Sequence, residues 1–172
     1  DAGNQLTLNT TLSADADSGA AGGLFGICTE AEDTTWDLSY INIKAAGITS
    51  AKYSGGVFGV LENNNTANVL TIQNGTNIQS EDNGSDNYGG LIGKYSAEKL
   101  AASLIVQKLT IRSAHKQMKT SYAGVIAQVS GKSYIKADAL TVSINQASDN
   151  GTYFGGLIGY SNDDTASLFL DA

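Results

Sequence analysis

Gly22-Gly23-Leu24-Phe25-Gly26 is the first of five copies of a short apolar glycine phrase that recurs through the chain. The other four copies begin at Gly55, Gly89, Ala123 and Gly155, so successive copies start 33, 34, 34 and 32 residues apart. A fixed period in this range is typical of stacked supersecondary units, each of which buries its apolar face only against its neighbours. The phrase therefore predicts a solenoid.

A second short element, which alternates apolar and polar residues, recurs out of phase with the glycine phrases. Its six copies are Leu6-Thr7-Leu8, Leu38-Ser39-Tyr40, Leu70-Thr71-Ile72, Leu109-Thr110-Ile111, Leu140-Thr141-Val142 and Leu168-Phe169-Leu170. This alternation is typical of a half-buried strand, and Asn-Gly pairs between the copies supply turns. The sequence predicts an all-β parallel β-helix of about five coils of about 33 residues. The lack of a six-residue rhythm favours a right-handed coil.

The repeat runs through nearly all of the 172 residues, which predicts one β-solenoid domain. The expected repeats lie near 20–53, 54–88, 89–122, 123–154 and 155–172, after an N-terminal half repeat at 1–19. The first residue is Asp1 rather than Met, and no basic-then-apolar leader is present, which is typical of a mature secreted product or of an excised fragment.

The net charge of −7 disfavours binding to nucleic acid or to an anionic membrane surface. No apolar run approaches the roughly 18 residues of a membrane span, so we expect no membrane insertion. Residues 94–136 nevertheless hold eight of the ten Lys and Arg residues and one acid, Glu98. This basic band is interpreted as a solvated face, and alternatively as a contact with a neighbouring molecule or an acidic glycan.

The strand in each glycine phrase is expected to be apolar on both faces, because adjacent strand residues point to opposite sides. One face fills the core, and the other must be covered by a loop, by the chain's own connection or by another molecule. We predict that the second row is a lateral seam for self-association. Its members are Phe25, Phe58, Ile92, Ile126 and Ile158.

The ends of a solenoid expose unpaired strand edges, which invite pairing with another chain. No amphipathic capping helix or charged end layer is evident at either end of the sequence. We therefore predict self-association through the end strands as well. The residues expected to take part are Leu6, Leu8, Leu168, Phe169 and Leu170.

Two rows of side chains suggest other roles. Tyr53, Tyr88, Tyr122 and Tyr153 lie one or two residues before the glycine phrases, and we expect them to form a structural ladder or, alternatively, a strip for stacking sugars. One hydroxyl per layer is expected to face outward from the Leu-Thr strands, which makes ice binding a third hypothesis. That row comprises Thr7, Ser39, Thr71, Thr110 and Thr141.

Signals for catalysis are weak, and we expect no enzyme activity and no catalytic residues. His115 is the only histidine, so the chain cannot form a multi-histidine metal site. We expect it to lie at the surface. The acid groups Asp15 with Asp17, Glu81 with Asp82 and Asp86, and Asp163 with Asp164 are expected to be solvated loop acids. We predict no cofactor, with calcium binding by these acids as an alternative and polysaccharide cleavage as a more distant one.

Two residue types with covalent chemistry remain. Cys28 is the only cysteine, so it forms no intrachain disulfide, and its apolar surroundings predict a buried thiol. Five Asn-x-Ser/Thr sequons are glycan attachment sites if the source organism glycosylates them. They begin at Asn9, Asn64, Asn74, Asn83 and Asn150.

The glycine phrases at 22–26, 89–93 and 155–159 resemble the GLUG motif, a repeat of bacterial cell-surface and adhesin-like proteins. The resemblance covers about residues 20–165, and this chain departs from it at Val57, Val125, Ala123 and Ala127. It implies an extracellular, nonenzymatic β-solenoid module at the cell surface, and it carries over no functional site.

We expect a structural or adhesive subunit that stacks end to end into a surface fibre or forms part of an adhesin stalk. Its partners would be other copies, the continuation of a longer repeat protein, or surface glycans. A carbohydrate-binding or polysaccharide-cleaving β-helix is the alternative, and an ice-binding protein is a further one.

Overall fold

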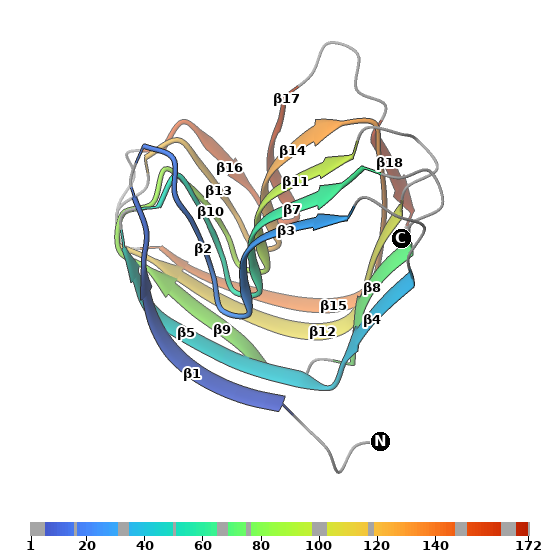
Figure 1. Cartoon of the computed structure of the whole chain (residues 1–172), viewed down its shortest axis with the longest axis horizontal. Coiled ribbons are helices and arrows are strands. Elements are labelled where there is room, and N and C mark those ends of the chain that lie inside the picture. The colour runs from blue at the N-terminus through green and yellow to red at the C-terminus, as the bar shows by residue number, and fades with distance from the viewer. Residues whose placement is uncertain are drawn as a thin grey trace.

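The computed structural model of the chain describes residues 6–15, 17–30, 35–49, 51–64, 69–74, 77–97, 103–116, 119–146, 151–162 and 168–171. The regular elements of these residues are β-strands, and the strands pair in parallel within three sheets. The stacked sheets form a β-solenoid, as the glycine period predicts (Figure 1).

Two of the sheets are built from the glycine phrases and contain five strands each. They form the two arms of a V at the top of the view (Figure 1). The first arm contains β2 (Ala20–Gly22), β6 (Tyr53–Gly55), β10 (Asn87–Gly89), β13 (Ser121–Ala123) and β16 (Tyr153–Gly155). The second contains β3 (Phe25–Glu30), β7 (Phe58–Asn63), β11 (Ile92–Ala97), β14 (Ile126–Gly131) and β17 (Ile158–Asn162).

The third, eight-stranded sheet closes the coil below the V (Figure 1). Along its main path lie β1 (Leu6–Ser13), β5 (Ile41–Thr49), β9 (Asn77–Asp82), β12 (Ser103–His115), β15 (Ser133–Gln146) and β18 (Leu168–Asp171). The two shorter strands β4 (Thr35–Ser39) and β8 (Val69–Gln73) continue it beside β12. We call this the large sheet.

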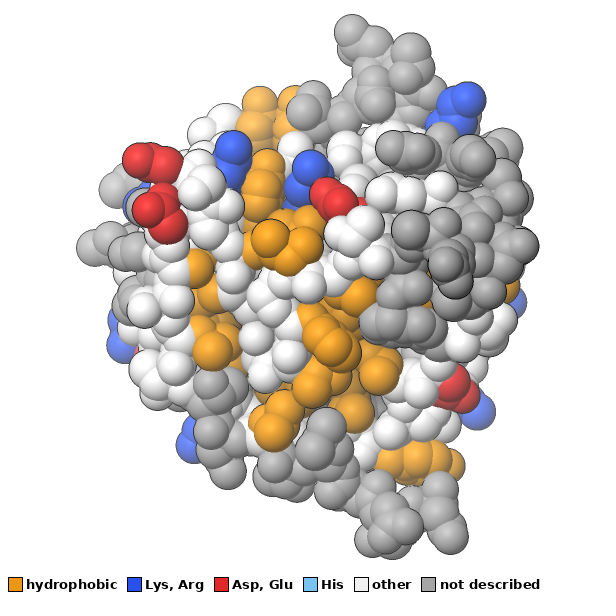
Figure 2. All heavy atoms as spheres, viewed as in Figure 1, with side chains coloured by type: hydrophobic (Ala, Val, Ile, Leu, Met, Phe, Trp, Pro, Cys, Tyr) orange, Lys and Arg blue, Asp and Glu red, His pale blue; other side chains and the backbone are white. Residues whose placement is uncertain are grey.

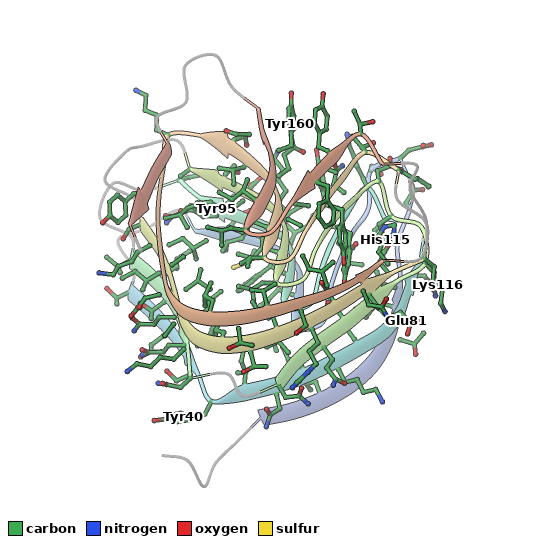
Figure 3. The ribbon with its side chains drawn as sticks, turned by 180° about the vertical axis from the view of Figure 1, so that it is seen from behind. Tyr40, Glu81, Tyr95, His115, Lys116 and Tyr160 are labelled. Carbon is green, nitrogen blue, oxygen red and sulfur yellow. The ribbon has the colours of Figure 1, made fainter. Side chains whose placement is uncertain are left out.

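The solenoid is right-handed. Followed from β1, which lies nearest the viewer, the chain runs clockwise as it recedes towards β16 and β17 (Figure 1). The view from the opposite side brings the C-terminal strands to the front (Figure 3). This hand agrees with the general preference for right-handed crossovers between parallel strands.

The glycine phrase is a corner rather than one straight strand. Gly56 and Val57 form the turn between β6 and β7, and the amides of Val57 and Phe58 both donate to the Leu91 carbonyl of the next coil, at 2.9 and 3.1 Å. A Cβ built on Gly56 would lie 2.3 Å from the Gly90 carbonyl oxygen, so only glycine allows the coils to approach this closely.

Because the chain turns a corner within the phrase, the predicted lateral seam does not form. Phe58, Ile92 and Ile126 are buried in the hydrophobic core, and Phe25 and Ile158 are partly buried and pack against it. The prediction that this row faces outward is therefore wrong. Strict alternation holds only along a straight strand, whereas the bend at Gly56 and Val57 changes the chain direction, and both apolar positions of the phrase belong to the same hydrophobic core.

A second corner divides the large sheet, and it uses left-handed backbone without glycine. Tyr40, Asn74, Lys108 and Ala139 have φ angles of 58°, 54°, 51° and 49°. The residues before them pair in register across the coils, so the four corner residues stack in one column. The Tyr40 amide donates to the Gln73 carbonyl and the Asn74 amide to the Gln107 carbonyl, each at 3.3 Å. Hydrogen bonds between coils thus continue through the corner.

This corner also separates the Leu-Thr elements, so they do not form the expected hydroxyl row. Ser39 and Thr71 precede the corner, whereas Thr7, Thr110 and Thr141 follow it or lie in the equivalent stretch of β1. Thr7 is paired with Asn42 and Thr71 with Asp37, and only Thr110 and Thr141 are neighbours. The predicted row of five is therefore wrong.

Candidate functional site

The last described layer of the solenoid leaves an open position beside its glycine corner. A Cβ built on Gly23, Gly56, Gly90 or Gly124 would lie 2.2 to 2.5 Å from the carbonyl oxygen of the corner glycine in the next coil. A Cβ built on Gly156 meets no atom within 4 Å. Among the described residues, none occupies the place where a further coil would pack at this end, which we call the C-terminal face.

An aromatic column inside the first arm ends at the same face. The rings of Tyr88 and Tyr122 stack at 5.3 Å, and those of Tyr122 and Phe154 at 5.4 Å. Both tyrosines are buried, whereas Phe154 is 53% exposed and its neighbour Tyr153 is 39% exposed. An exposed ring at the end of a buried stack is an apolar surface that a further layer would cover.

The C-terminal face also carries a groove of about 320 Å³ along β15. Its apolar lining comes from Leu140, Val142 and Ile144 of that strand and from Leu157 of the last corner, with Gly156 beside them. These leucine, valine and isoleucine side chains are only partly buried, whereas the equivalent Ile78 and Ile111 of earlier coils are fully buried. The groove is therefore the place where the hydrophobic core opens to the outside.

The opposite end, which we call the N-terminal face, is apolar too. Figure 2 shows this face towards the viewer, with hydrophobic side chains gathered over its centre. Ile27 of β3 is 63% exposed, and Leu24 and Phe25 are only partly buried. Both faces of the solenoid thus present apolar surface from their outermost described layers.

A polar cluster lies inside the solenoid at the turn after β9. The Asp82 carboxylate accepts hydrogen bonds from the Ser54 hydroxyl at 3.1 Å and from the amides of Gly84 and Ser85 at 2.9 and 2.8 Å. The Ser85 hydroxyl also donates to it, and His115 Nε2 lies 3.1 Å from its Oδ2 atom. Burial alone would raise the pKa of Asp82, but the hydrogen bonds from His115, Ser85 and Gly84 outweigh it and lower that pKa.

The sequence-based placement of His115 and Asp82 is therefore wrong, because both side chains are buried rather than solvated. Figure 3 shows His115 directed into the coil, with Glu81 and Lys116 at its outer edge. The alternation that starts at Leu109 and Ile111 places residue 115 on the inner face of β12, so this signal was present in the sequence. The cluster thus links the turn after β9 to β6 and β12 inside the solenoid.

The tyrosine ladder is only partly as expected. Tyr88 and Tyr122 share the inner face of the first arm, where their hydroxyls bond to Ser80 and to Ser113. Burial raises the pKa of Tyr122 to about 12. Tyr53 and Tyr153 precede their phrases by one residue more, so they pair with Asn87 and Ser121 on the other face. The expectation of one continuous ladder is wrong, and the two buried rings are closed to sugars.

A second groove, of about 340 Å³, runs across the outer side of the large sheet. One wall of this groove consists of Lys44 from β5, Gln79 from β9 and Arg112 from β12. Glu81 and Asn145 belong to the other wall. Arg112 Nη1 donates to Asn77 Oδ1 at 2.8 Å, which holds the guanidinium beside the groove. The arrangement offers two cations, two side-chain amides and the Glu81 carboxylate to a ligand.

Part of the basic band is neutralised within the chain. Lys116 pairs with Glu81, and Lys119 Nζ lies 3.3 Å from Asp86 Oδ1. Asp15 accepts the amide hydrogens of Asp17 and Ser18 in a local turn. Within the part of the chain that the structure describes, no group of three or more His, Cys, Asp or Glu side chains is placed to hold a metal ion. Asp163 and Asp164 lie outside the described residues.

The other predicted residues are placed as follows. The Cys28 thiol is buried, as predicted. Among the sequon asparagines, Asn9 lies on β1 and Asn74 at the left-handed corner. Asn64 directly follows β7, and Asn83 directly follows β9. Asn150 lies outside the described residues. Leu6, Leu168, Phe169 and Leu170 are described only as strand positions, on β1 and β18.

Among the described residues, no helix has the length and apolar character needed to cross a membrane. Comparison with known protein families, with curated proteins and with solved structures finds no match for the chain.

Proposed function

We propose that the chain is a structural β-solenoid unit that associates end to end with another solenoid layer. The observation that carries this proposal is the open position at Gly156, where the regular contact made by the four preceding corner glycines is missing. The exposed Phe154 ring and the apolar groove along β15 support it, because they lie at the same face.

The energetic argument follows from these surfaces. Burying one exposed aromatic or branched aliphatic side chain contributes about 1.5–3 kcal/mol, and strand edges gain hydrogen bonds when a further strand pairs with them. Phe154, Leu140, Val142, Ile144 and Leu157 would all be covered by one added coil. Such a surface favours association over the solvated monomer.

An extracellular, cell-surface location and membership of the GLUG-repeat proteins belong to the same proposal. They rest on the glycine phrases and on the resemblance described above. In this setting the chain would be a fibre subunit or a segment of an adhesin stalk.

Negative-stain electron microscopy and light scattering across a concentration series test the proposal. The purified chain should form linear assemblies whose mass grows with concentration. Phe154→Asp should abolish the assemblies, because it places a charge in the contact. Lys44→Asp is the control, since it changes charge on the exposed outer side of the large sheet and should leave assembly intact. A folded chain that stays monomeric at every concentration would contradict the proposal.

A second candidate function, glycan binding, is favoured by the outer groove that contains Lys44 and Arg112. Their charges match carboxylate or sulfate groups of acidic sugars, and Gln79 and Asn145 offer amide hydrogen bonds to hydroxyl groups. A glycan array comparing acidic with neutral oligosaccharides tests it. Binding should be selective for acidic chains and should be lost in Arg112→Ala; a lack of selectivity would exclude this function.

A further inference from the structure

The groove along β15 has the shape of a missing strand, and a strand of the chain itself has the matching position at the other end. We propose that β1 of a second copy occupies this groove, parallel to β15 and with Leu8 of that copy beside Val142. The inference rests on the end-to-end association proposed above and names the partner surface.

The C-terminal face lacks half a strand layer over β15. Residues 133–136 of β15 pair with β18, whereas the described residues place no strand beside 140–146 on that side. The inward side chains of this second half are Leu140, Val142 and Ile144, which line the apolar groove.

The N-terminal face carries the complementary half layer. β1 pairs with β5 along Leu6–Thr11 opposite Ile41–Ala46 and forms the outer strand of the large sheet at that end. It covers the stretch of the sheet that follows the left-handed corner, which is also the stretch left open on β15. One end thus has the half layer that the other lacks.

The register of the large sheet determines how the two would meet. A single row runs through Leu8, Ile43, Ile78, Ile111 and Val142. Continuing it into a second copy places the second copy's Leu8 beside Val142. Two residues to either side, Leu6 would lie beside Leu140 and Thr10 beside Ile144, by the same pairing that joins Leu109 to Leu140 and Ser113 to Ile144.

The first arm fits the same register. One inner row passes through Ala21, Ser54, Tyr88, Tyr122 and Phe154, so it begins with a methyl group and ends with an exposed ring. Stacking two copies places the Phe154 ring over the small Ala21 of the next. A bulky residue therefore meets a small one at the junction, as Tyr88 meets Ser54 within the chain.

The contact joins two different faces and continues the stacking direction of the coils, so copies joined in this way form an open filament rather than a closed ring. The filament would continue the three sheets across each junction, and it would have one direction, because all strands in the sheets are parallel.

Disulfide trapping tests this register. Thr7 of one copy should lie beside the exposed Thr141 of the next, in the row that continues through Asn42, Asn77 and Thr110. Neighbouring strands are about 4.8 Å apart, which suits a disulfide. Thr7→Cys and Thr141→Cys chains are mixed in equal amounts under mild oxidation, and covalent dimers are counted on a nonreducing gel. Every chain retains the buried Cys28 as a common background.

A mixture of Thr7→Cys with Ser143→Cys is the register control. Residue 143 lies two positions further along β15, which increases the Cα separation to about 8 Å and beyond disulfide range. We expect at least about tenfold more dimer from the 7/141 mixture than from the 7/143 mixture or from either single variant alone.

Equal dimer yields from the two mixtures, in samples that light scattering shows to be assembled, would overturn the inference and leave the end-to-end function standing. Samples that contain only folded monomers, as shown by circular dichroism and scattering, would overturn both. The two failures are therefore distinguishable.

Discussion

His115 and Asp82 lie side by side in adjacent coils, with Nε2 of the imidazole 3.1 Å from Oδ2 of the carboxylate, and both side chains are buried inside the solenoid. The carboxylate also accepts hydrogen bonds from two hydroxyls and two backbone amides. It therefore connects the turn after β9 with β6 and β12. Through these hydrogen bonds the carboxylate holds three elements of the fold together.

Replacing Asp82 with Asn should lower the free energy of unfolding by about 3 kcal/mol at pH 7, because the donors around it lose a buried negative partner. Urea denaturation measures the change. The control is Asp86→Asn, which removes only a partly exposed ion pair with Lys119 and should cost less than about 1 kcal/mol. Equal losses in the two variants would contradict a structural role for Asp82.

The same cluster predicts a pH dependence. The pKa of Asp82 is lower in the folded chain than its ordinary value of 3.8, so its contribution to stability is present above that value. The contribution is lost as the pH falls through the folded pKa. Consequently, the difference in unfolding free energy between the wild-type chain and Asp82→Asn should narrow below about pH 4. A difference that stays constant down to pH 2 would argue against the lowered pKa.

Alanine substitutions at two corner glycines should differ strongly in their effect on the stability of the monomer. A Cβ on Gly90 would lie 2.2 Å from the Gly124 carbonyl oxygen, so Gly90→Ala should destabilise the fold by at least about 2 kcal/mol. Gly156→Ala meets no atom within 4 Å and should change the stability of the monomer by less than about 0.5 kcal/mol. Thermal unfolding of dilute samples measures both. Assembly, in contrast, should be impaired by Gly156→Ala, since its added methyl group occupies the place of the next coil.

Glycine at the left-handed corner should relieve strain. Lys108 is exposed and has a φ of 51°, so Lys108→Gly should raise the free energy of unfolding by about 0.5 kcal/mol despite the flexibility that glycine adds to the unfolded chain. Lys44→Gly, at an exposed position in β5 without a positive φ, should lower it by about 1 kcal/mol. Should both variants lose stability alike, strain at this corner is absent.

Two isoleucines of the second arm, one in the core and one at the surface, allow the cost of losing a buried side chain to be compared with that of losing an exposed one. Ile92→Ala should cost about 2–5 kcal/mol, because Ile92 is fully buried. Ile27→Ala should cost less than about 0.5 kcal/mol in dilute solution, where the 63% exposed side chain faces water. Chemical denaturation of both variants gives the comparison, and a small effect at Ile92 would revive the idea of a lateral seam.

The fold was predictable from the sequence because the same short pattern occurs in every repeat, so the assignment does not depend on any single copy. Each glycine phrase alone is short, but five copies at a nearly constant spacing leave few architectures other than a parallel solenoid. The right-handed coil and the buried Cys28 also agree with the prediction.

The errors arose where backbone direction changes. Alternation predicts which residues face inward only within a straight strand, and the chain bends at Gly56 and Val57. The corner at Lys108 was invisible for a similar reason, since no glycine marks its positive φ. The polar residues around Asp82 and His115 in the sequence suggest solvent exposure. In the structure the two side chains contact each other across adjacent coils, a contact that the local sequence does not reveal.

The near-constant spacing of the corner glycines also bears on how such a chain can change length over evolutionary time. Loss of one whole repeat, such as residues 90–123, joins Gly89 to Gly124, and its duplication joins Ala123 to a second Gly90; both keep every sheet in register. A gain or loss of a few residues within a strand would instead misalign all the coils beyond it. We therefore expect insertions and deletions of whole coils to be tolerated, so the lengths of related chains should differ by multiples of about 33 residues.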